Sequence, residues 1–170
     1  MASFKELGIQ KDYIKGLKEL GINYPTEIQE STIPVLLNSS TDLIGLAQTG
    51  TGKTAAYGLP LLAQIDAKKP VVQGLILSPT RELAQQIKKQ LFKFTKYVEV
   101  RIFVEGVYGG EKIEKQIAAL ERTTHIVVAT PGRLIDLIER GAVDLKNLKT
   151  VVLDEADEML RMGFIDDVEN

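Results

Sequence analysis

Short apolar runs recur along the chain, with more polar stretches between them. The runs are DLIGL at 42–46, LIL at 75–77, RIFV at 101–104, HIVV at 125–128 and VVL at 151–153. Short runs that are apolar at consecutive positions are typical of strands buried on both faces of a sheet. The pattern therefore predicts five buried strands.

Helical spacing occurs between these runs. Apolar residues recur there three or four positions apart, which places them on one face of a helix. They are Leu83, Ile87 and Leu91, then Ile113, Ile117 and Leu120, and finally Leu134 and Ile138. Because strands alternate with helices, the sequence predicts an α/β fold whose mostly parallel sheet is flanked by helices.

Each predicted strand is followed at once by a polar or glycine-rich cluster. The clusters are AQTGTGKT at 47–54, SPTRELA at 78–84, EGVYGG at 105–110, ATPGR at 129–133 and DEAD at 154–157. Ligands of open parallel sheets bind at the carboxyl ends of the strands. The sequence thus predicts ligand-binding residues along one edge of the sheet.

Composition limits the chemistry available at this edge. The 170 residues fit a single domain, and they include no Cys and only one His, His125. Disulfides, thiolate zinc sites and clustered His ligands are excluded, so a bound metal would need oxygen ligands. His125 lies on an apolar run, where we expect a structural role.

Charge and hydropathy further limit the classes of protein to which the chain can belong. The net charge of -2 comes from 21 Lys and Arg against 23 Asp and Glu, without the basic excess of non-specific nucleic-acid binders. The opening MASFKELGIQKDY is charged where a signal peptide is apolar, and no run is long enough to cross a bilayer. We expect a soluble, cytoplasmic protein without a membrane partner.

The cluster AQTGTGKT fits a phosphate-binding loop, although Ala47 stands where the general pattern has Gly. Gly50 and Gly52 let backbone N–H groups approach phosphate oxygens, and Lys53 supplies a positive charge. Thr54 can place its hydroxyl on Mg²⁺. The alternative is a glycine turn before a helix, with an exposed lysine.

The run VVL delivers Asp154 and Glu155 to the same edge. Phosphoryl transfer to water needs Mg²⁺ near the phosphates and a group that positions the attacking water. Asp154 suits the metal, through coordinated water, and Glu155 suits the attacking water. The alternative is that carboxylates in a first helical turn favour the helix dipole, which is the interpretation we prefer for Glu158.

Six motifs, in this order and spacing, carry a family resemblance. They are YPTEIQ, AQTGTGKT, PTRELA, GG, TPGR and DEAD. Together they are similar to the first RecA-like domain of DEAD-box RNA helicases, from Phe4 to the C-terminus. The phosphate loop of that family typically begins with Ala, which accounts for Ala47. The resemblance implies a RecA-like P-loop fold, with an N-terminal helical segment at 1–40 that carries the adenine-reading motif and an ATP-binding core at 41–170.

The adenine-reading motif centres on Gln29, which matches the family's base-reading glutamine. Phe4 matches an aromatic residue upstream of it. Ile22 departs from the family, which usually has a residue that stacks on adenine there, so it offers apolar contact without stacking. The residues alone also predict a T-x-x-Q capping box of Thr26 and Gln29, and both roles stay open.

The nucleotide site implied by the resemblance binds ATP and Mg²⁺. Catalysis is assigned to Lys53, Asp154 and Glu155, and Mg²⁺ is assigned to Thr54 and Asp154. The ATP-binding positions are Phe4, Ile22, Gln29, Ala47, Gln48, Thr49, Gly50, Thr51, Gly52, Lys53 and Thr54.

The remaining motifs match RNA contacts of the family. Thr80 can cap the helix that begins beside it, with free amides and Arg81 facing a phosphate. Thr130, Pro131 and Arg133 repeat this arrangement at the next helix. Ordinary capping, with Pro131 at the first helical position, explains the second turn without RNA. Such contacts hold sugar and phosphate and carry little sequence information. The RNA-binding positions are Pro79, Thr80, Arg81, Gly109, Gly110, Thr130, Pro131, Gly132 and Arg133.

The resemblance implies further parts that do not occur before Asn170. Asp157 would couple the nucleotide site to a Ser-Ala-Thr motif, which a second RecA-like domain with an arginine finger follows. We therefore expect the ATP-binding and RNA-binding half of an ATP-dependent helicase that unwinds RNA duplexes or remodels RNA–protein complexes, with little activity alone. The Ser-Ala-Thr strand normally lies between the phosphate-loop strand and the DEAD strand. The gap would close, admit water or recruit a strand from another copy by self-association.

Two other functional classes stay open. A different P-loop ATPase or kinase would share the loop and carboxylates but would not need Gln29, Arg81 and Arg133. A non-enzymatic, nucleotide-dependent RNA-binding module is the second alternative.

Overall fold

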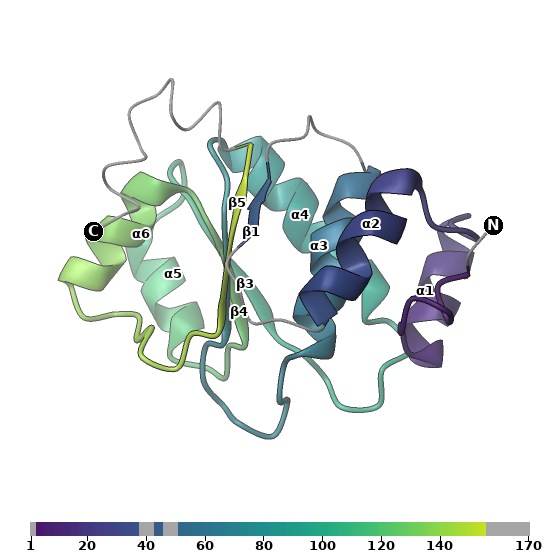
Figure 1. The fold of residues 1–170 in the computed structure, drawn as a ribbon. Coiled ribbons are helices and arrows are strands. Elements are labelled where there is room, and N and C mark those ends of the chain that lie inside the picture. The colour runs from purple at the N-terminus through teal and green to yellow at the C-terminus, as the bar shows by residue number, and fades with distance from the viewer. Residues whose placement is uncertain (1–2, 38–42, 46–50, 156–170) are drawn as a thin grey trace.

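The computed structural model describes residues 3–37, 43–45 and 51–155. Its centre is a parallel sheet of five strands in the order β1-β5-β2-β4-β3 (Figure 1). The strands are β1 Leu43–Gly45, β2 Gly74–Leu77, β3 Val104–Val107, β4 Ile126–Ala129 and β5 Thr150–Asp154. The predicted α/β fold with a parallel sheet is confirmed.

Helices cover both faces of this sheet. Figure 1 shows α5 and α6 on one side, and α1, α2, α3 and α4 on the other. Their bounds are α1 Lys11–Glu19, α2 Glu27–Leu37, α3 Thr51–Ala63, α4 Arg81–Phe94, α5 Ile113–Leu120 and α6 Pro131–Glu139. Within the described ranges, no helix is long and apolar enough to span a membrane.

Alternate residues of the central strands enter two separate apolar clusters. Ile76 and Val128 pack with the helices on the α3 and α4 side, whereas Leu77 and Val127 pack on the α5 and α6 side. Successive side chains of a strand point to opposite faces. The consecutive apolar residues of LIL and HIVV are explained by this burial on both faces.

The apolar spacing predicted three of the helices correctly. In α4, Ala84, Ile87 and Leu91 are buried. In α6, Leu134 and Leu137 are buried, whereas Ile138 is 45% exposed. Ile138 therefore lies in the predicted helix but outside its buried face. The buried residue after Leu134 on that face is Leu137, three positions further on.

The predicted strand RIFV is wrong in position. The observed strand β3 begins at Val104 and continues through Glu105 and Gly106 to Val107. Because β3 is an edge strand that pairs only with β4, three of its four residues are only half-buried, so a continuous apolar run is not required.

The N-terminal helices share the core of the rest of the domain. Phe4, Tyr13 and Ile33 belong to the same apolar cluster as Tyr57 and Leu91. The proposed boundary near residue 40 lies outside the described residues. No separate core is formed by the described part of this segment.

Strand β1 pairs directly with β5, in the register Leu43 with Val152, Ile44 with Leu153 and Gly45 with Asp154. We expected a gap at this position, because the family places another strand there. The described strands close that gap by pairing with each other, which satisfies the backbone groups between them.

Candidate functional site

The carboxyl ends of β1 and β5 lie side by side. Gly45, the last residue of β1, is in register with Asp154, the last residue of β5. Helix α3 then begins at Thr51. Of the predicted phosphate loop, Ala47, Gln48, Thr49 and Gly50 lie outside the described residues, and the side chains of Thr51 and Lys53 are not described. Of the two described ends that flank these residues, Gly45 lies beside Asp154.

Asp154 is held by a residue that the sequence did not suggest. Its Oδ2 accepts a hydrogen bond of 2.6 Å from the phenol of Tyr57. Both side chains are buried, with exposed fractions of 2% and 1%. Tyr57 follows Thr54 by three positions, so both lie on one face of α3, and that spacing is the signal that could have revealed it.

Burial raises the pKa of Tyr57 well above its ordinary value of 10, and the negative charge of Asp154 raises it further. A hydrogen bond with Thr54 acts in the opposite direction. The phenol therefore stays protonated at neutral pH and donates to the carboxylate. Thr54 and Asp154, the two predicted metal-binding residues, both contact this phenol.

The side-chain oxygens of Thr54 and Asp154 fit Mg²⁺ only at a site that is completed by other ligands, such as the phosphates of a substrate. In the described ranges, no group of three or more His, Cys, Asp or Glu side chains lies together. Mg²⁺ is commonly bound by one or two carboxylates together with substrate phosphates and waters. One buried carboxylate and one hydroxyl therefore fit Mg²⁺ that arrives with a nucleotide.

Glu155 follows β5 with a backbone φ of 57°. This left-handed conformation costs a residue other than glycine roughly 1 to 2 kcal/mol. Such strain often occurs at functional sites, where it fixes the direction of a side chain. Asp157 lies outside the described residues.

The predicted capping box at the start of α2 is confirmed. The amide of Thr26 donates to Oε1 of Gln29 at 2.9 Å, and the amide of Gln29 donates to Oγ1 of Thr26 at 3.4 Å. Gln29 and Phe4 are buried, and Ile22 packs against the same core. The positions of all three are explained by packing and capping, and adenine reading stays a prediction.

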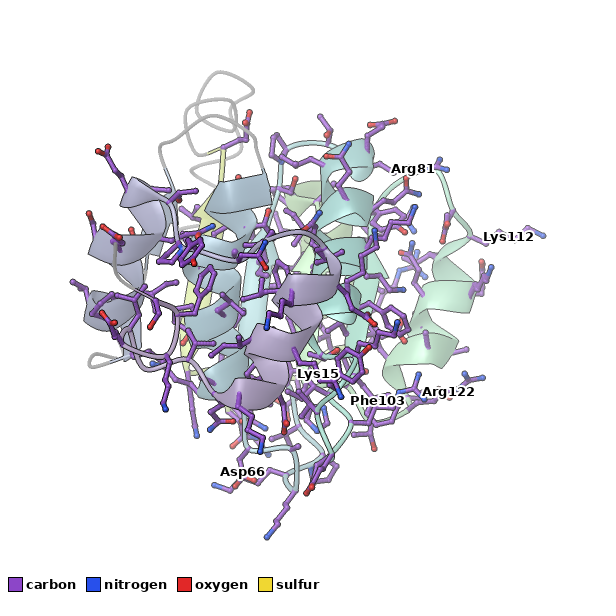
Figure 2. The ribbon with its side chains drawn as sticks, turned by 90° about the vertical axis from the view of Figure 1, so that its right-hand side faces the viewer. Lys15, Asp66, Arg81, Phe103, Lys112 and Arg122 are labelled. Carbon is purple, nitrogen blue, oxygen red and sulfur yellow. The ribbon has the colours of Figure 1, made fainter. Side chains whose placement is uncertain are left out.

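The ends of β2 and β3 meet through Arg81 and Gly110. Thr80 caps α4 by accepting a hydrogen bond of 3.2 Å from the amide of Leu83. Arg81, at the first position of α4, covers Gly110, because a Cβ placed there would lie 2.5 Å from its Nη1. In Figure 2, Arg81 lies toward the same end of the molecule as Lys112, and Asp66 lies toward the opposite end.

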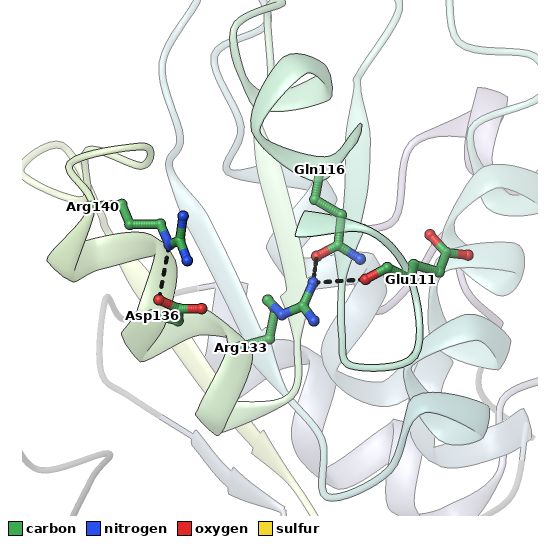
Figure 3. Close-up of polar contacts among 5 residues, drawn as sticks. All are labelled: Glu111, Gln116, Arg133, Asp136 and Arg140. Carbon is green, nitrogen blue, oxygen red and sulfur yellow. Dashed lines mark hydrogen bonds and ion pairs between the residues drawn. The ribbon is translucent and has the colours of Figure 1, made fainter. Parts of the chain in front are cut away.

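Arg133, which follows the end of β4, contacts the same turn as Arg81. Its Nη1 donates to the carbonyl of Glu111 at 3.1 Å and to Oε1 of Gln116 at 2.9 Å (Figure 3). The amide of Gln116 then donates to the carbonyl of Tyr108 at 2.9 Å. Arg133 and Gln116 therefore hold the turn that contains Gly110. The sequence did not suggest Gln116, because its partners lie on other elements.

Thr130 differs from Thr80 in its local role. It occupies the N-cap position of α6, but its side chain accepts no capping hydrogen bond in the described structure. Its amide donates instead to the carbonyl of Val107 at 3.1 Å, and Pro131 begins the helix. The prediction that the side chain of Thr130 repeats the capping by Thr80 is therefore wrong, and Pro131 begins α6 without that capping bond.

His125 is structural, as predicted. Its Nδ1 accepts a hydrogen bond of 2.9 Å from the amide of Phe103, and its Nε2 lies 3.2 Å from the carbonyl of Ala67. These partners place the proton on Nε2. Burial lowers the pKa of His125 below its ordinary value of 6.5.

The parallel sheet and the loops at its strand ends define a RecA-like domain. The model of the family described as DEAD/DEAH box helicase matches residues 26–170. This chain therefore belongs to the DEAD/DEAH box helicase family.

Its relatives include the DEAD-box ATP-dependent RNA helicase CshA of two bacteria. The chain is 51% identical to that of Bacillus cereus over 169 residues, which covers 99% of this chain and 32% of the relative. For that of Geobacillus kaustophilus the identity is 48%, with 99% and 36% covered. The chain thus spans about a third of the length of these curated relatives.

Solved structures agree with this fold. A DEAD box protein from the hyperthermophile Methanococcus jannaschii matches with a TM-score of 0.89 and 41% identity, over 98% of this chain and 45% of that one. The RNA helicase Prp28 from Chaetomium thermophilum bound to ADP matches with a TM-score of 0.86 and 40% identity, over 99% and 42% of the two chains.

Proposed function

We propose that this chain is the ATP-binding and RNA-binding half of an ATP-dependent DEAD-box RNA helicase. The observation that carries the proposal is the pairing of β1 with β5, which puts Gly45 in register with Asp154. The last described residue before the predicted phosphate loop therefore lies beside the first residue of DEAD. Loops at adjacent parallel strand ends are where such sheets bind nucleotides.

In this proposal, Lys53 and the amides of the loop bind the phosphates of ATP, and Gln29 reads the adenine. The N-terminus of α3 adds the positive end of its dipole. Mg²⁺, when bound, would neutralise phosphate charge, and Thr54 and Asp154 would hold it. Glu155 orients the attacking water and accepts its proton.

RNA binds along the neighbouring turns in this proposal. Arg81 covers Gly110, and Arg133 donates to the carbonyl of Glu111 in the same turn. The starts of α4 and α6 would present the positive ends of their helix dipoles to a phosphate, as other helix N-termini do. Contacts of this kind follow the sugar–phosphate backbone, so we expect binding with little sequence preference.

Unwinding belongs to the intact protein in this proposal. Asp157 couples the nucleotide site to a second RecA-like domain, whose arginine finger completes hydrolysis and which bends one RNA strand. The intact protein is proposed to act in the cytoplasm. The 170-residue chain alone is expected to hydrolyse ATP near background, even with RNA present.

The test is ATP turnover by the intact protein with and without single-stranded RNA. We expect RNA to stimulate turnover, and Glu155→Gln to retain ATP binding while losing most turnover, because an amide cannot accept the proton of water. Glu158→Gln is the matched control and should remain active. Turnover without RNA stimulation would indicate another P-loop ATPase, and ATP-dependent RNA binding without turnover would indicate a non-enzymatic module.

A further inference from the structure

A buried hydrogen bond joins the helix after the phosphate loop to the strand that carries DEAD. Tyr57 lies on α3 and Asp154 ends β5, and their side chains meet at 2.6 Å. Both are almost fully buried. The bond therefore connects two elements that must keep a fixed relation if loop and carboxylate act on one ligand.

The chemistry of the pair gives the bond one direction. A buried carboxylate is costly unless donors satisfy its oxygens. An ionised carboxylate can only accept a hydrogen bond, whereas a phenol carries a hydrogen to donate, so Tyr57 is the donor and Asp154 the acceptor. A length of 2.6 Å is typical of a hydroxyl that donates to an ionised carboxylate.

The tyrosine also lies beside Thr54. The two residues are three positions apart on α3, and their side chains share a hydrogen bond. Thr54 and Asp154 are the two residues that the proposed function assigns to Mg²⁺. The phenol thus contacts both groups that would share the cation.

We propose that Tyr57 is a positioning residue that holds the carboxylate of Asp154 in the orientation that binds the Mg²⁺ of a nucleotide. The inference rests on the proposed function, because it assumes that ATP with Mg²⁺ binds at this edge. It assigns to Tyr57 no contact with the nucleotide.

Tyr57→Phe tests this role, because it removes one hydroxyl and keeps the ring that fills the core. ATP affinity is measured on the full chain by calorimetry, once with Mg²⁺ and once with EDTA. We expect about tenfold weaker binding with Mg²⁺, the loss typical of one charge-assisted hydrogen bond, and unchanged affinity in EDTA. In an Asp154→Asn background, Tyr57→Phe should produce no further loss in Mg²⁺.

Tyr13→Phe is the matched control. Tyr13 is also buried, and its phenol donates to the carbonyl of Leu62 at 3.4 Å, away from Asp154. It should leave both affinities unchanged. Thermal melting of each variant shows whether it is folded.

The outcomes separate this inference from the proposed function. If wild type binds ATP in Mg²⁺ and Tyr57→Phe binds equally well, the inference fails alone. An equal loss with Mg²⁺ and with EDTA would mean a general structural role and would also overturn it. If wild type binds no ATP under either condition, the proposed function and the inference both fail.

Discussion

The hydrogen bond between Arg133 and Gln116 should couple stability to RNA binding. Gln116 is buried and makes two hydrogen bonds, one to the carbonyl of Tyr108 and one from Arg133. We predict that Gln116→Ala weakens RNA binding, although this side chain is too buried to touch RNA, because the turn at Gly110 loses its support.

The magnitude follows from the number of bonds lost. Each net hydrogen bond contributes about 1 kcal/mol, and a buried group left without its partner costs about 1 to 3 kcal/mol. Gln116→Ala should therefore lower the free energy of unfolding by about 2 to 3 kcal/mol. Arg133→Ala loses its bonds to Glu111 and Gln116 and should cost about 2 kcal/mol, because Arg133 is only partly buried.

A double-mutant cycle isolates the shared bond. The double variant should cost about 1 kcal/mol less than the sum of the two single variants, because their common bond is lost only once. Urea unfolding gives the stabilities, and fluorescence anisotropy with single-stranded RNA gives the affinities.

Arg140→Ala, at the C-cap of the same helix, is the control. Arg140 pairs with Asp136 at 3.0 Å on the surface of α6 (Figure 3), and such exposed pairs contribute about 0.3 to 0.5 kcal/mol. It should leave RNA affinity unchanged. Strict additivity of Gln116→Ala and Arg133→Ala, or unchanged RNA affinity in Gln116→Ala, would refute the reasoning.

Three further predictions concern local features of the fold. Gly110→Ala should lower the free energy of unfolding by about 1 to 2 kcal/mol and weaken RNA binding, because φ is 89° there and the new methyl would displace Arg81. Gly109→Ala, which has open space around its Cβ, should change RNA affinity less. Gln29→Ala and Thr26→Ala should each lower stability by about 1 kcal/mol in urea unfolding, but only Gln29→Ala should also reduce the preference for ATP over GTP, by about 1 to 3 kcal/mol in competition binding. Burial lowers the pKa of His125 below 6.5 in the folded protein, so as pH falls the unfolded chain binds a proton on this imidazole before the folded chain does. The stability that is fully present above pH 6.5 should therefore be lost as pH falls through the pKa of the folded state. His125→Asn should flatten the pH dependence of the unfolding free energy between pH 7 and 5, and an equal slope in both proteins would contradict this origin.

The sequence predicted best the strands that are buried on both faces and the caps whose partners are close in the sequence. LIL and HIVV became β2 and β4 because both faces of the inner sheet are covered by helices. The helix cap at Thr80 and the capping box of Thr26 and Gln29 were predictable because their hydrogen bonds join residues that are close in the sequence.

The sequence predicted least where a residue depends on distant parts of the chain. Strand β3 was misplaced because an edge strand tolerates Glu105 and Gly106. Tyr57 and Gln116 have no motif, because their partners Asp154 and Arg133 are 97 and 17 positions away. The direct pairing of β1 with β5 likewise depends on which strands are available to the sheet, which periodicity does not encode.

The most direct test of the nucleotide site is calorimetric titration of the chain with ATP and Mg²⁺, for wild type, Lys53→Ala and Lys69→Ala. Lys53 follows the glycines of the phosphate loop, whereas Lys69 is exposed in the loop that enters β2, at the opposite edge of the sheet. We predict binding to wild type and Lys69→Ala and no detectable binding to Lys53→Ala, because the phosphates lose their principal cation from the protein. Equal affinity in all three proteins would contradict a phosphate site at the ends of β1 and β5.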